Sequence, residues 1–313
     1  MRAFVLVGPT AVGKSDVAQW IAEKLGVPIL SADSMLVYRG MDIGTAKPTP
    51  AERGSVPYFG IDCVEAGAPF STGAWLAFVR RQMAEYEGMD NSGGAAHSPS
   101  VVVAGGTGLY VRALISGLNA PPADPQARAE WTSLYRACGR GALHRALLAH
   151  PAALALLGKD DLHNPRRIIR ALERAEAGER PSGDAPAPPD RPVAGLLMPR
   201  DRLAARIAAR IDKMFKAGLV EEAVALRAAG GLSDTAAGAI GYAEALAVAD
   251  GLLSPQEARD RVAARTRQLA KRQMTWFRHQ LKVEWVDVAD GDTPATLGPK
   301  VMEVWKRHGH FEV

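Results

Sequence analysis

The chain has 313 residues, of which 47% are hydrophobic and 23% charged, with a formal net charge of +4 and a sequence pI near 9.1. This is ordinary for a soluble globular protein of one large domain or of a core with a smaller domain, and no apolar run approaches the roughly 18 residues of a membrane span. The cysteines Cys63 and Cys138 form no disulfide framework or metal-ligand spacing, and the first strand leaves no room for a signal peptide, so we expect a cytoplasmic protein.

The chain opens on a strand, a loop and a helix. Apolar residues 3–7 predict a buried parallel strand, and a helical stretch covers 16–25. The loop between them fits the pattern G-x-x-x-x-G-K-[ST] and consists of Gly8, Pro9, Thr10, Ala11, Val12, Gly13, Lys14 and Ser15. In such a loop backbone N–H groups surround phosphate oxygens, the lysine neutralises the outer phosphates and the hydroxyl can hold Mg²⁺. The alternative is a plain strand-to-helix turn.

Strand and helix patterns alternate through the first 120 residues. A short strand at 27–32 leads to Asp33, a helical stretch follows around 75–86, a polar glycine-rich loop covers 91–99, and residues 100–104 form another buried strand. Strands separated by helices predict a parallel sheet with helices on its faces.

The second half of the chain begins with a strand-free helical segment, expected from residue 121 to about 177, and a proline-rich stretch at 180–192. The remaining elements are expected to be a strand at 193–198, long helices at about 201–229 and 255–282, a strand at 283–288 and a terminal helix. The fold class is therefore α/β, with a P-loop-type parallel-sheet core flanked by helices (1–122 and 193–313) and a helical insertion domain (123–192).

Three loops carry candidate chemistry. Asp33 follows a strand at the edge where the phosphate loop lies, so its carboxylate can act as a general base or position a metal, unless it merely caps the next turn. Residues 42–48 (Asp-Ile-Gly-Thr-Ala-Lys-Pro) fit neither a helix nor a strand and predict a shaped, functional loop. Residues 105–110 bring glycines and the Thr107 hydroxyl to the same crevice, although glycine-rich turns are common after strands.

Basic residues concentrate near the C-terminus. Between residues 259 and 282 the chain has a net charge of +7, with Trp276 and Phe277 among the cations. This favours nucleic-acid contact, the alternative being a solvated helix face. A second basic cluster, at 163–170, either binds the same polyanion or is a surface helix start. Four residues separate Arg206 from Arg210, which places both on one helix face, where they could reach a diphosphate or pair with surface acids.

Several of these motifs occur together in one known family. They are the loop at 8–15, residues 33–38, 41–48, 105–110, 164–167 with 170–173, 240–242 and 268–278. Through them the chain resembles the tRNA dimethylallyltransferases, also called tRNA isopentenyltransferases, nearly end to end. It departs from the usual pattern at Gly238, Ala239 and Ala243, and at the segment 57–59.

The resemblance implies transfer of a dimethylallyl group from dimethylallyl diphosphate to the exocyclic amine of an adenosine. That adenosine lies 3′ of the anticodon in tRNAs that read codons beginning with U. The loop would then hold a diphosphate, helped by Arg206 and Arg210, with Mg²⁺ on Ser15. The implied catalytic residues are Asp33, Lys14, Ser15, Thr107 and Arg210, of which Asp33 would take the amine proton.

The family also implies contacts with the tRNA anticodon stem-loop, partly through the insertion. The residues carried over are Asp33, Ser34, Met35, Leu36, Thr107, Arg128, Arg166, Arg167, Ile168, Ile169, Arg170, Gly241, Tyr242, Lys271, Arg272, Trp276 and Arg278. We expect a monomer with no membrane partner, since no coiled-coil heptad or long apolar stripe is present. A P-loop kinase or a nucleic-acid-binding NTPase is the alternative.

Overall fold

The computed structural model describes residues 1–90, 100–117, 124–178 and 190–313. The expected loop at 91–99 and most of the proline-rich stretch lie outside these residues. The chain divides into two compact units, one formed by Met1–Leu118 with Pro188–Val313 and the other by Asn119–Ala187. Among the described helices, none is long and apolar enough to cross a membrane.

The first unit is built on a mostly parallel sheet with the strand order β4-β2-β6-β1-β7-β8, and the short β9 pairs antiparallel with β1. Its strands are β1 (Arg2–Val7), β2 (Ile29–Ser31), β4 (Tyr58–Phe59), β6 (Ser100–Gly105), β7 (Val193–Leu197), β8 (Val283–Asp287) and β9 (Phe311–Glu312). A separate two-stranded sheet pairs β3 (Tyr38–Arg39) with β5 (Val64–Glu65). The predicted α/β class is confirmed, whereas the two-residue strands and the C-terminal antiparallel strand were not foreseen.

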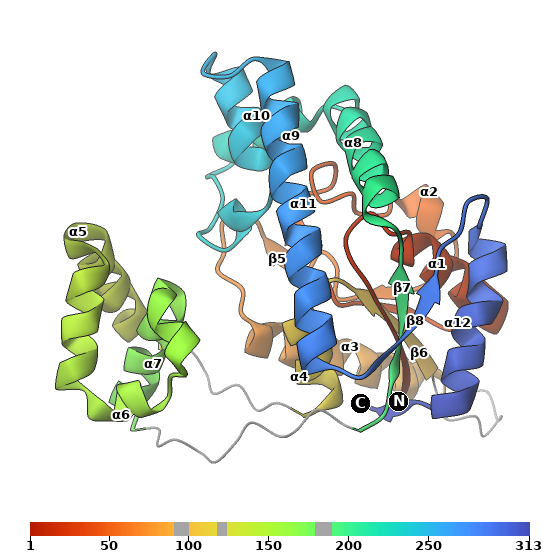
Figure 1. Ribbon diagram of the computed structural model, residues 1–313, viewed down its shortest axis with the longest axis horizontal. Helices are drawn as coiled ribbons and strands as arrows, with labels where there is room; N and C mark the ends of the chain where they lie inside the picture. Colours follow the sequence, from red (N-terminus) through yellow and green to blue (C-terminus); the bar gives the residue numbers. More distant parts are fainter. Residues whose placement is uncertain (91–99, 118–123, 179–189) are drawn as a thin grey trace. The chain divides into compact units, whose positions relative to one another are not determined.

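The helices of this unit lie on both faces of the sheet (Figure 1). They are α1 (Lys14–Leu25), α2 (Pro50–Arg53), α3 (Thr72–Asp90), α4 (Gly108–Ile115), α8 (Arg200–Lys216), α9 (Leu219–Ala228), η2 (Ala236–Gly238), α10 (Tyr242–Ala249), α11 (Pro255–Gln280) and α12 (Pro294–His308). Because side chains alternate along a strand, Val5 and Val7 belong to one core and Leu6 to the other. The first core holds residues of α3 and α4, and the second holds residues of α1, α8 and α12.

The prediction of one helix over about 201–229 was wrong. The helix ends at Lys216, and Gly218, with a φ of 100°, precedes a second helix. This left-handed backbone is strained for residues with a Cβ, so glycine permits the turn here. The break also lets Glu222, in the first turn of α9, bind a distant loop.

The second unit is entirely helical within the part that the structure describes. It contains α5 (Pro125–Ala149), which is kinked at Gly139, α6 (Pro151–Ala155), η1 (Lys159–His163) and α7 (Pro165–Glu176). The buried Glu173 carboxylate accepts hydrogen bonds from the backbone of Asp124 and from the side chains of Arg128 and Arg170. This carboxylate therefore links α5 to α7.

Candidate functional site

The turn after β1 has the geometry of a phosphate loop. A Cβ on Gly8 would lie 2.8 Å from the backbone oxygen of Leu196, so only glycine fits against β7. Gly13 has a φ of 102°, and α1 begins directly after it. The glycines at both ends of the loop let its backbone run close to β7 and into the N-terminus of α1, an arrangement that suits an anion.

Lys14 is the cation at the centre of the candidate site. Its ammonium donates a hydrogen bond to the Pro9 carbonyl at 2.7 Å. Desolvation lowers the pKa of Lys14 to about 8, the neighbouring Asp33 carboxylate acts to raise it, and Arg210 acts to lower it further. Lys14, Asp33 and Arg210 thus lie close enough for their charges to interact.

Two of the four arginines of α8, Arg206 and Arg210, lie near this loop. Arg210 donates a hydrogen bond to the Thr45 carbonyl at 3.0 Å, and burial lowers the pKa of its guanidinium while Asp33 acts to raise it. A Cβ on Gly13 would lie 3.5 Å from Nη2 of Arg206, so this guanidinium is beside the loop. Within the described residues no hydrogen bond or ion pair engages Arg206, which leaves its charge available to an anion.

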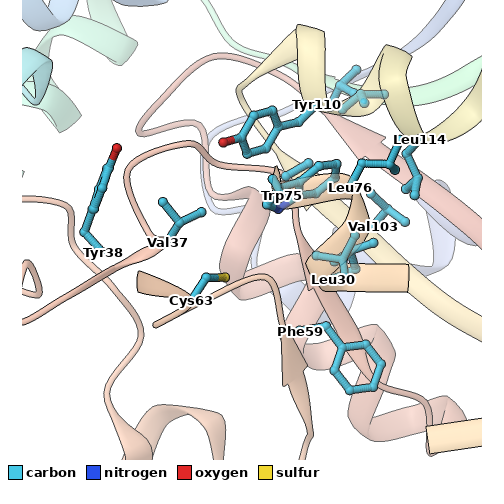
Figure 2. Close-up of a cluster of buried hydrophobic side chains, with 14 of the residues drawn as sticks. Leu30, Val37, Tyr38, Phe59, Cys63, Trp75, Leu76, Val103, Tyr110 and Leu114 are labelled. Atoms are coloured by element: carbon cyan, nitrogen blue, oxygen red, sulfur yellow. The ribbon is translucent and has the colours of Figure 1, made fainter. Parts of the chain in front are cut away.

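The turns that follow β2 and β6 also lie near the loop at 8–15. Asp33 Oδ1 accepts a hydrogen bond from the Met35 amide at 2.9 Å, so this residue both caps the turn and presents a carboxylate. Thr107 Oγ1 accepts from the Ser34 amide at 3.0 Å and donates to the Ser34 hydroxyl at 3.2 Å. Tyr110, in the first turn of α4, stacks its ring on that of Trp75 from α3, with centroids 4.2 Å apart (Figure 2). This contact anchors the start of α4.

The loop at 42–48 is shaped by a residue that sequence reasoning missed. The Glu222 carboxylate accepts hydrogen bonds from the amides of Asp42, Ile43 and Gly44, at 2.8–3.1 Å, and from the hydroxyl of Tyr242 at 2.7 Å. This holds the segment that presents the Thr45 carbonyl to Arg210.

Tyr242, which was expected at the tRNA, lies in the interior of the first unit. Its side chain is fully buried. A Cβ on Gly44 would lie only 2.6 Å from the ring of Tyr242, so the ring packs directly against this glycine. Tyr242 and the preceding Gly241, with a φ of 112°, therefore shape the start of α10 and the 42–48 loop. Lys47 is also internal, since its ammonium binds Asp42, Asp62 and the Tyr38 carbonyl.

The basic helix α11 has two faces. Lys271, Arg272 and Arg278 are exposed, as nucleic-acid contact requires. Other cations of the run are already paired, namely Arg259 with Asp212, Arg265 with Glu244 and Lys282 with Asp190. Arg261 and Arg267 are exposed as well, so exposed positive charge extends along the helix from Arg261 to Arg278.

The inner face of α11 contains Gln273, a second residue that sequence reasoning missed. Its side-chain oxygen accepts from the Thr10 amide at 2.8 Å and its amide donates to the Gly106 carbonyl at 3.1 Å. Trp276 packs against Gly108, where a Cβ would lie 2.0 Å from the ring. The spacing of Gln273, Trp276 and Phe277 on one helix face is the signal that could have indicated an inward role.

Four of the expected tRNA contacts lie at the start of α7, where two are exposed and two are buried. Arg166 and Arg167 are exposed on the first turn of α7, although Arg167 pairs with Asp161. Ile168 and Ile169, expected at the tRNA, are instead buried in the core of this unit, at 0% and 7% exposure. Their side chains stabilise the helical fold because burial removes apolar surface from water.

Comparison with known proteins decides the family. Residues 36–280 match the family model described as IPP transferase, and residues 1–57 match the one described as isopentenyl transferase. The chain is 40% identical to a tRNA dimethylallyltransferase of Kineococcus radiotolerans, over 96% of this chain and 95% of that protein. The chain belongs to the IPP transferase family.

Two further relatives agree with this membership. A tRNA dimethylallyltransferase of an Anaeromyxobacter species is 43% identical over 91% of this chain and 94% of its own length. The crystal structure of the tRNA isopentenylpyrophosphate transferase of Bacillus halodurans is similar with a TM-score of 0.65 and 34% identity, over 99% of both chains.

In this IPP transferase, Ser15 is the residue that the sequence predicts to hold Mg²⁺. Its side chain is exposed in the first turn of α1, and no hydrogen bond engages its hydroxyl within the described residues. The same residues contain no cluster of three His, Cys, Asp or Glu side chains that could form an all-protein cage. A hydroxyl beside a phosphate loop fits Mg²⁺, which commonly takes its other ligands from phosphate oxygens and water.

Proposed function

We propose that this protein transfers a dimethylallyl group from dimethylallyl diphosphate to the exocyclic amine of the adenosine next to the anticodon, on its 3′ side, in tRNAs that read codons beginning with U. The observation that carries the proposal is the grouping of one carboxylate, Asp33, with the cations Lys14 and Arg210 beside the loop. A prenyl transfer needs both a proton acceptor and a seat for a leaving diphosphate. We further propose that the enzyme acts in the cytoplasm as a monomer.

The diphosphate would lie against the loop at 8–15. The loop amides, Lys14, Arg206 and Arg210 would stabilise the negative charge that develops as the carbon–oxygen bond breaks. Mg²⁺ on Ser15 would, when bound, neutralise further charge on the leaving group. Thr107 would hold the Ser34 turn in place on the acceptor side.

The adenosine amine would attack the first carbon of the dimethylallyl group. A nitrogen–carbon bond forms, the bond from that carbon to the diphosphate oxygen breaks, and the amine proton passes to the Asp33 carboxylate. The adenine must leave the anticodon-loop stack to reach this site, a step that basic and aromatic residues can support.

Product analysis tests the proposed function directly. The protein is incubated with unmodified tRNA, Mg²⁺ and dimethylallyl diphosphate, and the nucleosides are weighed by mass spectrometry. The expected result is a dimethylallyl mass gain on one adenosine and release of diphosphate. A parallel reaction with ATP reports on the kinase and NTPase alternatives, and ATP turnover without prenyl transfer would contradict the proposal.

The exposed end of α11 is expected to contact tRNA phosphates. Replacing both Lys271 and Arg272 by alanine should weaken tRNA binding and reduce the slope of log Kd against log salt by about 1 to 2, because two counterion-releasing contacts are lost. Fluorescence anisotropy at several salt concentrations measures this. The matched control replaces Lys300 and Lys306 on α12 by alanine. Lys300 pairs with Asp292 and Lys306 with Glu303. A slope equal to that of the unsubstituted protein would refute the assigned contacts.

A further inference from the structure

Gln273 joins the two loops between which the reaction would take place. Its oxygen holds the Thr10 amide in the diphosphate loop, and its nitrogen holds the Gly106 carbonyl one residue before Thr107. The first loop follows β1 and the second follows β6, and these strands are neighbours in the sheet. The side chain thus connects the diphosphate loop to the turn that carries Thr107.

The contact is tight and uses both an acceptor and a donor of the amide group. A Cβ on Gly106 would lie 2.3 Å from Nε2 of Gln273, so the side chain touches the backbone there. One amide supplies an acceptor to Thr10 and a donor to Gly106, which neither an ionised carboxylate nor an ammonium can do. The pairing therefore selects glutamine for its two different hydrogen-bonding atoms.

Each loop is also tied to a residue of the proposed reaction. Pro9, next to Thr10, accepts the hydrogen bond of the Lys14 ammonium. Thr107, next to Gly106, binds the backbone and hydroxyl of Ser34, which follows Asp33. A displacement of either loop would be transmitted to the cation or to the proton acceptor.

We propose that Gln273 is a positioning residue that sets the separation between the prenyl diphosphate and the acceptor amine. This proposal rests on the proposed function and extends it. The outer face of α11 is proposed to bind tRNA, and Gln273 gives the inner face of the same helix a role in aligning the reacting groups. Transfer requires the reacting atoms to be within about 3–3.5 Å, and a misplacement of about 1 Å can lower a rate about a hundredfold. Gln273 contributes alignment and no charge.

The first test replaces Gln273 by alanine. We expect the single-turnover rate at saturating tRNA and dimethylallyl diphosphate to fall about tenfold to a hundredfold. The Kd values for tRNA and for diphosphate should change less than about threefold, because neither ligand loses a charged partner. Gln256→Ala is the matched control, since Gln256 is exposed on the same helix and donates a hydrogen bond to the exposed Asp260. Its rate should equal that of the unsubstituted protein.

The second variant, Gln273→Glu, separates positioning from a general loss of structure. A protonated carboxyl group has the shape of an amide and again offers one donor and one acceptor, whereas the ionised group repels the Gly106 carbonyl. The rate of Gln273→Glu relative to the unsubstituted protein should therefore rise as the pH falls from 8 to 5.5. The same ratio for Gln273→Ala should stay flat.

The outcomes distinguish a failure of the positioning role from a failure of the proposed function. Equal single-turnover rates for Gln273→Ala and the unsubstituted protein would overturn the positioning role, as would a Gln273→Glu ratio independent of pH. A rate loss explained entirely by weaker tRNA or diphosphate binding would overturn it too. Failure of the unsubstituted protein to form any prenylated adenosine would instead overturn the proposed function itself.

Discussion

Replacing Asp33 by asparagine is expected to lower the single-turnover rate of prenyl transfer by about 10² to 10⁴-fold. Asparagine can still accept the Met35 amide hydrogen bond that Asp33 accepts, so the turn after β2 should be retained. It cannot take the amine proton, and general-base catalysis contributes a factor of this size. Rapid-quench measurement with saturating substrates gives the rate.

Binding measurements distinguish the base from a tRNA contact. The Kd of tRNA for Asp33→Asn should remain within about threefold of the unsubstituted value, because no positive charge is removed from the tRNA-binding surface. Loss of tRNA binding with an unchanged single-turnover rate would contradict the assignment. Ser34→Ala serves as a comparison, since it removes a hydroxyl beside Thr107 and leaves the carboxylate in place.

The affinity for diphosphate is expected to fall above pH 8. The pKa of Lys14 is about 8 because burial disfavours its charged form, so the ammonium that would bind the anion is increasingly neutral at higher pH. Below pH 8 the lysine is protonated and the affinity should be nearly constant. Above it, the Kd should rise by up to about tenfold per pH unit, as measured by calorimetry at a fixed Mg²⁺ concentration.

Lys14→Met is the control for the ionisation of the ligand itself. This variant should bind diphosphate about a hundredfold more weakly, since a partly buried charge partner is removed. It should also lose the additional decrease in affinity above pH 8. If both proteins show the same pH profile, Lys14 is not the titrating group.

Local chemistry made the phosphate loop and the strands predictable. The pattern of Gly8 to Ser15 could be recognised because the left-handed backbone dihedral angles of Gly13 and the start of α1 depend on residues that are adjacent in the chain. The buried runs that became β1, β6 and β7 were likewise recognisable, since strands covered on both faces are continuously apolar. Asp33 was proposed for a similar reason, as it follows a strand at the sheet edge where ligands bind in open α/β folds.

The partners of individual side chains were not predictable in this way. Tyr242 has an aromatic side chain of the kind that often contacts nucleic acids. In the structure it is buried against Gly44, and its hydroxyl donates a hydrogen bond to Glu222. Ile168 and Ile169 follow exposed arginines in the sequence, but the helical period turns them into the core. All three were expected at the tRNA because the family resemblance implied it, and a motif shared with a family does not say which of its side chains face inward.

The sequence by itself determined the class of the fold, the turn between the first strand and helix, and the family, because each depends on residues that are close in the chain or on motifs in a shared order. Only the tertiary structure decided which distant groups meet. Arg210 reaches the Thr45 carbonyl across 165 residues, and Gln273 reaches the Thr10 amide across 263. Such contacts arise from the packing of α8 and α11 against loops of the sheet, and no local pattern specifies them, since a hydrogen bond depends on distance in space and not on separation along the chain.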